Sequence, residues 1–384
     1  MSRVSSLRGQ IASKLHVLTL ARSRRDWSLA GVIVAAFVGV LASASLATPY
    51  KEPPLQVFYE NESAQEDTTY LRAHITKRSG DTATVRLLDG PRVGQTVTLM
   101  INPAIAPEVG EKILVREAPG SDAPLHYLTR WRVPGLLVMA AVFVALVVLV
   151  GGRRGAMSLL GLVASLMVIG WGIIPLIAAG WPAFWVCLAG ALAIALVSVL
   201  ISHGFHRRTY VSIGIIVAIL LVVAALSWAA ITLFGLTGIT DESTLYLSMA
   251  ETSIDLRGVL AGGMIIATLG VLDDVVTTQV AAVDELQKAQ PDASATRIAA
   301  QANSIGREHI SSLVNTLALA YTGASLPFIL LLVLRSGGVP PLVIVSGEYL
   351  SVEIARTLVA SIGLLIAVPA STYAAVYIFR RLLK

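Results

Sequence analysis

The chain has 384 residues, of which 55% are hydrophobic and 14% are charged, and its formal net charge is +5. Soluble globular proteins carry about 25% charged residues, so this composition indicates a membrane protein and excludes an ordinary soluble domain. The positive charge does not indicate nucleic-acid binding. The sequence has no zinc-finger spacing or aromatic-interleaved basic patch, and its basic residues lie between apolar runs.

Apolar runs determine the expected fold class, because about 20 such residues cross a bilayer as a helix. The lone cysteine, Cys187, lies inside one of these runs, where we expect a buried thiol without a disulfide. We expect a polytopic α-helical membrane protein with about eight transmembrane helices, at residues 28–47, 133–150, 156–178, 182–201, 211–234, 258–283, 309–334 and 354–379.

The first run, 28–47, allows two interpretations. Arg24 and Arg25 precede it and Ser45-Leu46-Ala47 ends it, an arrangement that is also typical of a cleaved signal peptide. The long segment before the run and its nearly full spanning length favour a retained helix. Cleavage would leave seven helices in the same orientation.

The distribution of basic residues predicts the orientation. Arginine and lysine are concentrated in residues 1–27 and in every second short connection, whereas the opposite short loops are acidic. The positive-inside rule therefore places a basic N-terminus, 1–27, and the C-terminus in the cytoplasm. The residues that carry this bias between the runs and at the end of the chain are Arg153, Arg154, Arg207, Arg208, Lys288, Arg297, Arg307, Arg380, Arg381 and Lys384.

Residues 49–132 form a polar region that we expect outside the membrane. Segments 70–77, 83–88, 96–101 and 112–116 alternate or are β-branched, and Gly and Pro lie between them, which is typical of short strands and tight turns. We expect a small β-barrel or sandwich that leans on the membrane part or on a neighbouring copy. No nucleophile–base pair is visible in this region, so we do not expect an enzymatic domain, and a docking or gating module is the open alternative.

Two adjacent carboxylates, Asp273 and Asp274, lie inside the run 258–283. An ionised side chain at the centre of a membrane helix costs at least about 2.5–3.5 kcal/mol, so such residues usually face a bundle interior or a watery cavity. Helical geometry places the two about 100° apart, and only Asp274 shares a face with threonines. We therefore favour Asp274 as an ion or proton site; Asp273 would lie nearer an interface or pair with an arginine.

Hydroxyl and amide oxygens surround the expected site. Thr277 and Thr278 follow Asp274 at i+3 and i+4, and Asn315 and Thr316 lie at a similar expected depth in the next run, about 5 Å apart along the membrane normal. Carboxylate, amide and hydroxyl oxygens are the ligands of hard cations and of proton relays. The alternative is that these side chains only join helices through hydrogen bonds. Close helix packing is expected at the glycines of the same run, Gly258, Gly262, Gly263 and Gly270.

The connection 284–308 is expected to be an ordered cytoplasmic element. Asp292 or Ser294 would cap a helix that continues into the seventh run. Arg307 would lie near the inner mouth of the polar site and hold an anionic substrate or pair with a carboxylate. A positive-inside anchor is the alternative.

On the opposite side, Gly337-Gly338-Val339-Pro340-Pro341 interrupts the seventh run and precedes an apolar segment too short to cross. Glu348 and Glu353 follow it. They would form an outer vestibule for cations, or Glu353 would form an ion pair with Arg356 at i+3. The His203-x-x-His206 spacing has no carboxylate or cysteine beside it, so interfacial histidines next to Arg207 and Arg208 are favoured over a metal site. The identity of any metal is left open.

With these residues the chain resembles the YibE/F family of bacterial integral membrane proteins, from the strand-rich region onward. The resemblance implies a multi-pass protein of the bacterial plasma membrane but no particular activity. It also favours Asp274, since the chain has Asp273 where the family pattern has an apolar residue. The most specific similarities are Gly270-x-x-x-Asp274-Val275, Asn303-x-x-Gly306-Arg307-Glu308 and Asn315-Thr316-Leu317-x-Leu319-Ala320-Tyr321-x-Gly323-x-Ser325-Leu326-Pro327.

Two hypotheses about function follow. The first is a transporter or permease for a small ion or solute, centred on Asp274. The second is a non-transporting scaffold or accessory subunit whose external domain binds envelope partners. A third hypothesis, a lipid-modifying enzyme, has less support than either. The expected partners are the lipid bilayer, a small ion or solute and a second copy of the chain, without a cofactor, a catalytic residue or nucleic acid.

Overall fold

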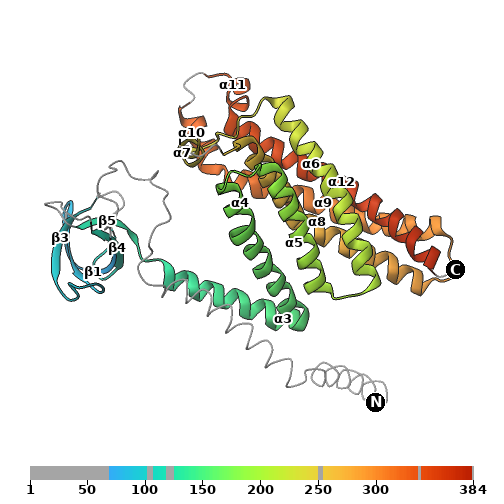
Figure 1. Ribbon diagram of the computed structural model, residues 1–384, viewed down its shortest axis with the longest axis horizontal. Helices are drawn as coiled ribbons and strands as arrows, with labels where there is room; N and C mark the ends of the chain where they lie inside the picture. Colours follow the sequence, from blue (N-terminus) through green and yellow to red (C-terminus); the bar gives the residue numbers. More distant parts are fainter. Residues whose placement is uncertain (1–68, 102–106, 118–124, 250–253, 336–338, 383–384) are drawn as a thin grey trace, which may run out of the picture. The chain divides into compact units, whose positions relative to one another are not determined.

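A computed structural model describes residues 69–101, 107–117, 125–249, 254–335 and 339–382. The expected N-terminal segment 1–27 and first helix 28–47, with its signal-peptide alternative, lie outside these residues. The chain divides into two units, Met1–Ala156 and Met157–Lys384. The first contains a β-sheet and the second a bundle of helices (Figure 1).

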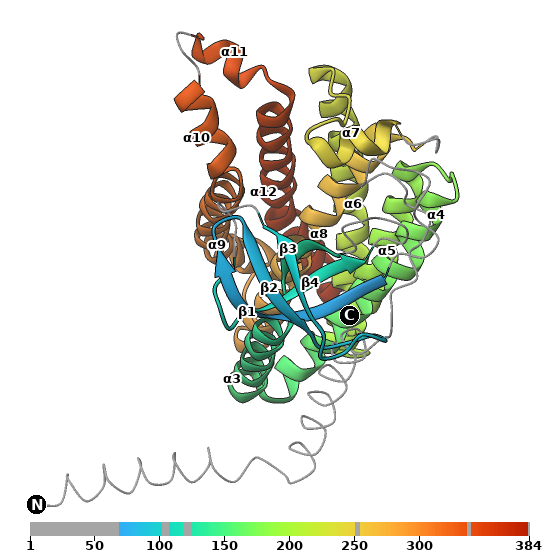
Figure 2. The ribbon, with the colours of Figure 1, turned by 90° about the vertical axis from the view of Figure 1, so that its left-hand side faces the viewer.

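The sheet has five antiparallel strands in the order β3-β2-β1-β4-β5. The edge strands β3 and β5 also contact each other, so the sheet curls into a half-barrel (Figure 2). The first four strands confirm the prediction, and the fifth was not predicted. The strands are β1 (Thr69–Ser79), β2 (Thr82–Leu87), β3 (Thr96–Met100), β4 (Lys112–Glu117) and β5 (Leu125–Arg130).

Alternation along the strands gives the half-barrel its own core. In β1, Leu71, Ala73 and Ile75 are at most 2% exposed. Side chains of a strand point alternately to its two faces, so these three residues share the inner face. They pack with alternate residues of the neighbouring strands, such as Val85 of β2 and Val115 of β4, in one apolar cluster. The barrel-like core predicted from the alternating segments is therefore present.

An ion pair joins β1 to the turn after β2. The Arg72 guanidinium donates to both carboxylate oxygens of Asp89, at 2.5 and 2.8 Å, and the Arg72 backbone N–H donates to the same carboxylate at 3.2 Å. The hydrogen bonds from the guanidinium hold the pKa of Asp89 below its usual value. The guanidinium also lies 5.6 Å from the ring centre of Trp131, which follows β5. This contact adds a cation–π attraction.

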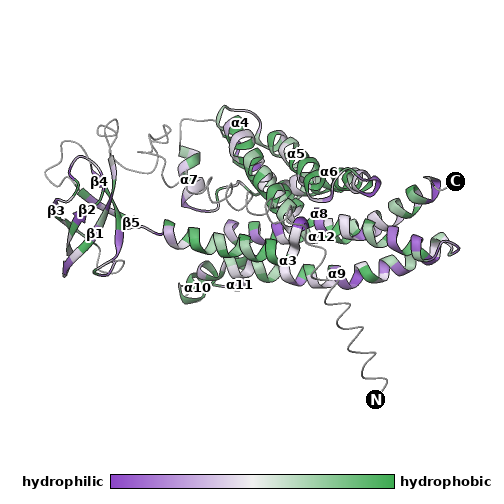
Figure 3. Cartoon of the chain, turned by 90° about the horizontal axis from the view of Figure 1, so that it is seen from below, coloured by the Kyte–Doolittle hydropathy of each residue, from purple (hydrophilic) through white to green (hydrophobic). Residues whose placement is uncertain are grey.

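The helices are predominantly apolar (Figure 3). Among the described residues, five runs are long and apolar enough to cross a membrane, and six if the bent pair of helices Ala295–Ala324 and Leu326–Leu334 is counted as one span. The elements are α3 (Val133–Met167), a π-helix η2 (Val168–Ile173), α4 (Ile174–Ala178), α5 (Ala183–His203), α6 (Arg207–Phe234), α7 (Glu242–Met249), α8 (Leu256–Ala289), α9 (Ala295–Ala324), α10 (Leu326–Arg335), α11 (Pro341–Val345) and α12 (Glu348–Leu382).

The second and third predicted helices lie in the 46-residue run Val133–Ala178. Gly152 interrupts this run with φ 57° and ψ −137°, so the run is two helices joined at a kink. The next turn, at Gly180 with φ 84°, separates α4 from α5 where a break between the third and fourth helices was predicted. Both breaks depend on glycine, because a left-handed φ is unfavourable for residues with a Cβ.

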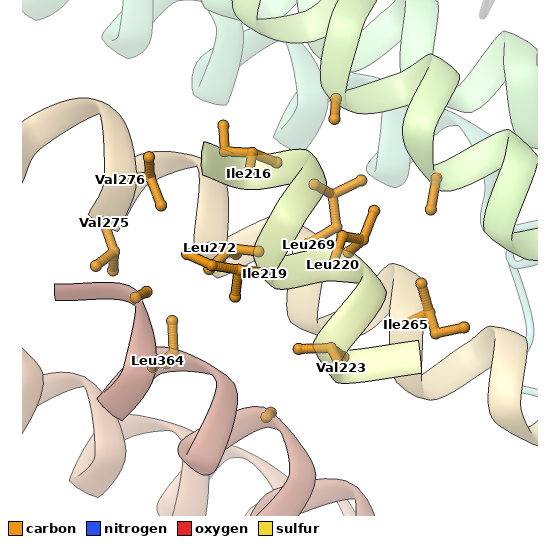
Figure 4. Close-up of a cluster of buried hydrophobic side chains, with 14 of the residues drawn as sticks. Ile216, Ile219, Leu220, Val223, Ile265, Leu269, Leu272, Val275, Val276 and Leu364 are labelled. Carbon is orange, nitrogen blue, oxygen red and sulfur yellow. The ribbon is translucent and has the colours of Figure 1, made fainter. Parts of the chain in front are cut away.

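Helix α8 lies at the centre of the bundle and contacts α5, α6, α9 and α12. Leu272 and Val276 of α8 face Ile216, Ile219 and other residues of α6, and Leu364 of α12 lies beside them (Figure 4). Figure 2 shows α12 between α9 and α6, which agrees with its contacts. The largest continuous core of the second unit therefore surrounds one helix.

Glycine permits the closest approach of α8 to its neighbours, but only at two of the four predicted positions. A Cβ on Gly262 would collide with the buried side chain of Cys187, and one on Gly258 would lie 2.8 Å from the backbone N of Phe184. A Cβ on Gly263 or Gly270 would meet no atom within 4 Å. The packing prediction is therefore wrong for Gly263 and Gly270, because the rotation of α8 turns them away from its neighbours.

The seventh predicted run differs in its boundaries. Helix α9 begins at Ala295, and Ser294 caps it by accepting a hydrogen bond from the Arg297 N–H at 3.2 Å. Ser294 is one of the two predicted caps, and the helix continues from the connection into the seventh run, as predicted. At its far end α9 bends by 58° into α10. This bend lies before the Gly-Gly-Val-Pro-Pro interruption that the sequence suggested.

The close approach at Gly262 can be tested against its neighbour. We expect Gly262→Val to lower the free energy of unfolding by about 1–3 kcal/mol, because the added side chain overpacks the contact with Cys187. Gly263→Val should change it by less than about 0.5 kcal/mol, because that position meets open space. Thermal unfolding of the detergent-purified full chain measures both, and equal losses would contradict the assigned rotation of α8.

The ion pair of the half-barrel predicts a pH effect. Since the pKa of Asp89 is lowered in the folded state, its contribution is present above the unfolded pKa and is lost as the pH falls through the folded pKa. Asp89→Asn should therefore destabilise β1 and β2 by about 0.5–1 kcal/mol at pH 7. The difference from the unsubstituted chain should shrink below about pH 4.

Hydrogen-exchange protection of β1 amides in the full chain, corrected for the intrinsic rate at each pH, measures this difference. Asp81→Asn is the control, because Asp81 is an exposed carboxylate in the neighbouring turn. A difference for Asp89→Asn that persists unchanged at pH 3 would contradict the role of the ionised pair.

Candidate functional site

The packing of α8 determines where its carboxylates lie. Leu272, Val275 and Val276 are at most 1% exposed, and they turn the same side of the helix toward α6 and α12 (Figure 4). Asp274 is on the other side and is exposed, whereas Asp273 is half-buried. The predicted separation of the two carboxylates around the helix is therefore observed. Within the described residues, neither carboxylate has a side-chain partner.

Asp274 belongs to a narrow open stripe on a helix that is otherwise largely buried. A period of 100° per residue brings these exposed positions onto one face. The stripe combines small and polar residues, so it forms a line with little side-chain bulk at the middle of the helix. We call it the α8 stripe; its members are Gly263, Gly270, Asp274, Thr278 and Glu285.

The two threonines have different positions. Thr278 is exposed and shares the α8 stripe with Asp274. Thr277 is 8% exposed, and its hydroxyl donates to the backbone carbonyl of Asp274 at 3.2 Å. A hydroxyl that bonds within its own helix needs no other partner. Of the two predicted threonine ligands, only Thr278 therefore has a hydroxyl without a partner in the described residues and lies on the same face as Asp274.

Asn315 and Thr316 are both exposed on α9. The Thr316 hydroxyl donates to the carbonyl of Ser312 at 2.9 Å, and no hydrogen bond joins either residue to Asp274 in the described structure. Gln279 of α8 bonds to the carbonyl of Ala302 and lies against Gly306, so this part of α9 is level with Gln279 along the bundle axis. From that level, at 1.5 Å per residue, Asp274 lies about 7 Å and Asn315 about 16 Å along the bundle.

The difference of about 9 Å exceeds the 5 Å expected from the sequence. The expectation assumed that the helices end near residues 283 and 309, whereas they continue to Ala289 and from Ala295. The structure therefore places Asn315 farther from the hairpin than Asp274. Asp274 and Asn315, the two exposed polar positions, therefore lie at different depths along the bundle.

A buried amide that the sequence analysis did not consider joins three helices. Gln279 is 4% exposed, and its side-chain amide donates to the carbonyl of Ala302 at 2.8 Å and to the Thr372 hydroxyl at 2.7 Å. A Cβ on Gly306 would lie 2.8 Å from the Gln279 Oε1 atom. Gln279 therefore holds α8, α9 and α12 together where α9 has no side chain. The sequence contained one signal for this junction, namely an amide side chain among apolar residues of α8 and a glycine in the facing helix.

The half of α9 that is nearer to the turn after α8 carries further polar groups. Arg307 is exposed, and within the described residues no hydrogen bond or ion pair holds its side chain at a mouth of the site. In the same half of α9, three buried side-chain atoms have no hydrogen-bond partner among the described residues: Gln301 Oε1, Asn303 Oδ1 and His309 Nε2. Buried polar atoms normally have a partner, so these three positions indicate where water or an ion would complete the structure.

The two predicted outer carboxylates each contact the protein. Glu348 accepts hydrogen bonds from the backbone N–H groups of Thr237 and Gly238, at 2.6 and 2.8 Å, and thus joins the start of α12 to the segment after α6. Glu353 forms an ion pair with Arg356 at 2.6 Å, with side chains 17% and 26% exposed. This was one of the two interpretations of Glu353. The Glu348 bonds were not foreseen.

Arg356 extends this set of contacts to α9. Its guanidinium carbon lies 6.0 Å from the ring centre of Tyr321. A guanidinium over an aromatic face is attracted to the ring. The end of the bundle at the start of α12 is therefore braced by charge contacts, unlike the α8 stripe.

The remaining candidates from the sequence are two histidines and the cysteine, and within the described residues they form no metal site. His206 lies at the start of α6, and its Nδ1 is 3.0 Å from the carbonyl oxygen of His203. In the described parts of the chain, no group of three or more His, Cys, Asp or Glu residues could hold a metal ion. Cys187 is free and 4% exposed, as the sequence predicted.

Comparison with known proteins gives one match. The family model described as YibE/F-like protein matches residues 139–381, which include α8, α9 and α12. The strands, Thr69–Arg130, lie outside the matched range, although the resemblance seen in the sequence extended to them. Searches of curated proteins and of solved structures found no match.

The junction at Gln279 predicts a large stability effect. Gln279→Ala should lower the free energy of unfolding by about 2–3 kcal/mol, because it leaves a cavity and removes two buried hydrogen bonds between helices. Thermal unfolding of the full chain in detergent measures the loss. Gln290→Ala, at the end of α8, is the control, and an equal midpoint for the two variants would contradict the junction.

Proposed function

The chain belongs to the YibE/F-like protein family, and for this multi-span membrane protein we propose a transport function. It would be a permease for a small ion or solute, with Asp274 as the cation or proton site. The observation that carries this proposal is the position of Asp274, which is exposed halfway along the most buried of the candidate spans.

The depth of Asp274 makes its exposure costly. It lies ten residues before Asp284 and seventeen after Arg257, or about 15 and 25 Å along the helix. The hydrocarbon core of a bilayer is about 30 Å thick, so Asp274 lies inside it when these charged residues are near its borders. A carboxylate there costs at least about 2.5–3.5 kcal/mol when it faces lipid, which favours a watery path or a covering protein surface.

Two further features support a path along the α8 stripe. Thr278 adds a hydroxyl beside Asp274, and Asn315 and Thr316 add oxygens farther along the bundle on α9. Carboxylate, hydroxyl and amide oxygens suit a hard cation or a proton relay. The 58° bend between α9 and α10 gives the bundle a broken helix, an element that transporters place beside their substrate sites.

The proposed topology has eight spans. Five runs and the bent pair give six. The run Val133–Ala178, broken at Gly152, would cross twice, and the segment 28–47 would add the eighth. By the positive-inside rule both termini lie in the cytoplasm of a bacterial cell, and the half-barrel lies outside the plasma membrane. Arg307 would then be near the inner mouth of the path, and Glu348 and Glu353 near its outer end.

A scaffold is the second candidate function. The half-barrel has its own core and lies outside the range that the family model matches, which suits a domain that binds envelope partners. In this alternative, a second copy of the chain would cover Gly263, Gly270 and Asp274, and Asp274 would brace the assembly. Neither candidate requires a cofactor or an enzymatic activity.

Asp274→Asn tests transport directly. The substitution keeps the shape of the side chain and removes its charge, so a cation or proton site should lose at least about 90% of its flux. Flux is measured in liposomes that contain the full chain, with a panel of monovalent and divalent cations and a proton-sensitive dye. Asp292→Asn is the control, because Asp292 is an exposed carboxylate in the connection between α8 and α9.

The other outcomes separate the hypotheses. Flux in both variants would overturn Asp274 as the site and leave transport in place. No flux for any solute in the unsubstituted chain, together with a change in oligomeric state for Asp274→Asn, would favour the scaffold.

A further inference from the structure

A cavity of about 460 Å³ lies at the arginine-rich end of the bundle. It opens where the start of α6, the last turns of α8 and the end of α12 come together. All of its lining residues belong to the helical unit, and none is part of the α8 stripe. The cavity therefore requires an explanation separate from the proposed transport path.

The lining of the cavity has an excess of positive charge. Arg207, Arg208 and Lys288 line it, and Asp284 is the acidic residue among its lining residues. Asp284 lies 2.6 Å from the Lys288 ammonium and 3.6 Å from the Arg208 guanidinium, and Glu285 lies 3.4 Å from Arg208 and 3.6 Å from Lys288. These carboxylates hold two of the cations in place.

Arg207 has no ion-pair partner among the described residues. The three cations and two carboxylates leave one positive charge, which favours an anion. A guanidinium presents several N–H groups in a plane and binds carboxylate or phosphate oxygens in pairs.

A buried amide in the same wall lacks an acceptor. Gln287 is 9% exposed and lines the cavity, and its side-chain nitrogen Nε2 has no hydrogen-bond partner. A buried donor without an acceptor is destabilising, so this position normally has a ligand or a water. The missing group is an acceptor, which an anion would supply through its oxygens.

The start of α6 adds a third source of attraction. This helix has 28 residues, and no side chain caps its N-terminus. The N–H groups of Thr209 and Tyr210 bond to the carbonyl of His206, whereas those of Arg207 and Arg208 precede the first bonded turn. Free N–H groups and the helix dipole favour an anion at this end. The cations, the amide and the helix end therefore select the same kind of ligand.

We infer that this cavity binds a phosphate group. Tetrahedral phosphate offers enough oxygens to accept from the Arg207 guanidinium, the Gln287 amide and the backbone N–H groups together. Phe379, which is 7% exposed, and Pro291 supply apolar surface beside these donors. This suits the phosphate of an anionic lipid headgroup, and a free phosphate in solution shares the same chemistry. The inference does not depend on transport.

Binding to the full chain in a neutral detergent tests the site. The probes are inorganic phosphate, a short-chain phosphatidylglycerol and a phosphatidylcholine of equal chain length. The unfolding midpoint is followed against probe concentration, since a ligand of the folded state raises it in a saturable way. We expect saturation by phosphatidylglycerol, by inorganic phosphate or by both, and weaker binding of the zwitterionic lipid.

Two substitutions assign the binding to the cavity. Arg207→Ala and Gln287→Leu should each weaken it about tenfold or more, because each removes donors to the anion. Gln287→Leu also removes an unpaired buried amide, so its unfolding midpoint without probe should be unchanged or higher. Arg297→Ala is the matched control: it removes one exposed basic residue at the start of α9, outside the cavity, and should leave the affinity unchanged.

Each outcome decides the inference. Saturation by phosphatidylglycerol alone would identify a lipid headgroup, and saturation by inorganic phosphate as well would identify a general phosphate site. No saturable binding of either anionic probe, or equal affinity in Arg207→Ala, Gln287→Leu and the unsubstituted chain, would overturn it. An equal loss in Arg297→Ala would also overturn it, because the effect would then be one of net charge.

Discussion

The close approach of helices at α8 is the contact on which the bundle depends. Gly258 and Gly262 let α8 lie against α5, where Phe184 and Cys187 occupy the space of a Cβ. Gly363 of α12 permits a similar approach to α6, where a side-chain atom of Val223 lies 2.7 Å from its Cβ position. Because membrane helices gain little from apolar burial against each other, such close backbone contacts contribute much of their association.

This packing fixes the rotation of α8 and so sorts the polar residues of the bundle. Gln279 turns inward and finds two partners, whereas Asp274 and Thr278 turn outward and find none in the described structure. At the start of α12, Glu348 and Glu353 have partners as well. Polar groups with partners explain how the bundle holds together, and those without partners are the ones that call for a ligand, water or a protein neighbour.

The fold was predictable where a local pattern carries it. Alternation gave β1 to β4, but Leu125–Arg130 was missed because it leads directly into the apolar run at Val133 and lacks buried alternation after Leu125. The separation of Asp273 from Asp274 follows from 100° per residue. Which of the glycines touch a neighbour does not, because Gly262 and Gly263 are adjacent and only the rotation set by other helices distinguishes them.

Long-range contacts explain the other differences. The depth of Asn315 depended on where the hairpin turns, and the capped start of α9 at Ala295 lies well before the apolar part of the helix. The Gln279 junction joins residues 93 positions apart in the chain, so no local spacing could indicate it. The cavity likewise forms only where three helix ends meet, which no local pattern predicts. Its arginines were noted in the sequence, but as an indication of membrane orientation.

The two proposed sites share α8 but are independent of each other. Asp274 and Gln287 are thirteen residues apart, which is about 20 Å along the helix and about 140° around it. The first lies on the open stripe, and the second is buried in the wall of the cavity. No described hydrogen bond or ion pair connects them, and the Gln279 junction lies between their levels. A ligand in the cavity would therefore influence Asp274 only by changing how α6, α8 and α12 pack at their shared end.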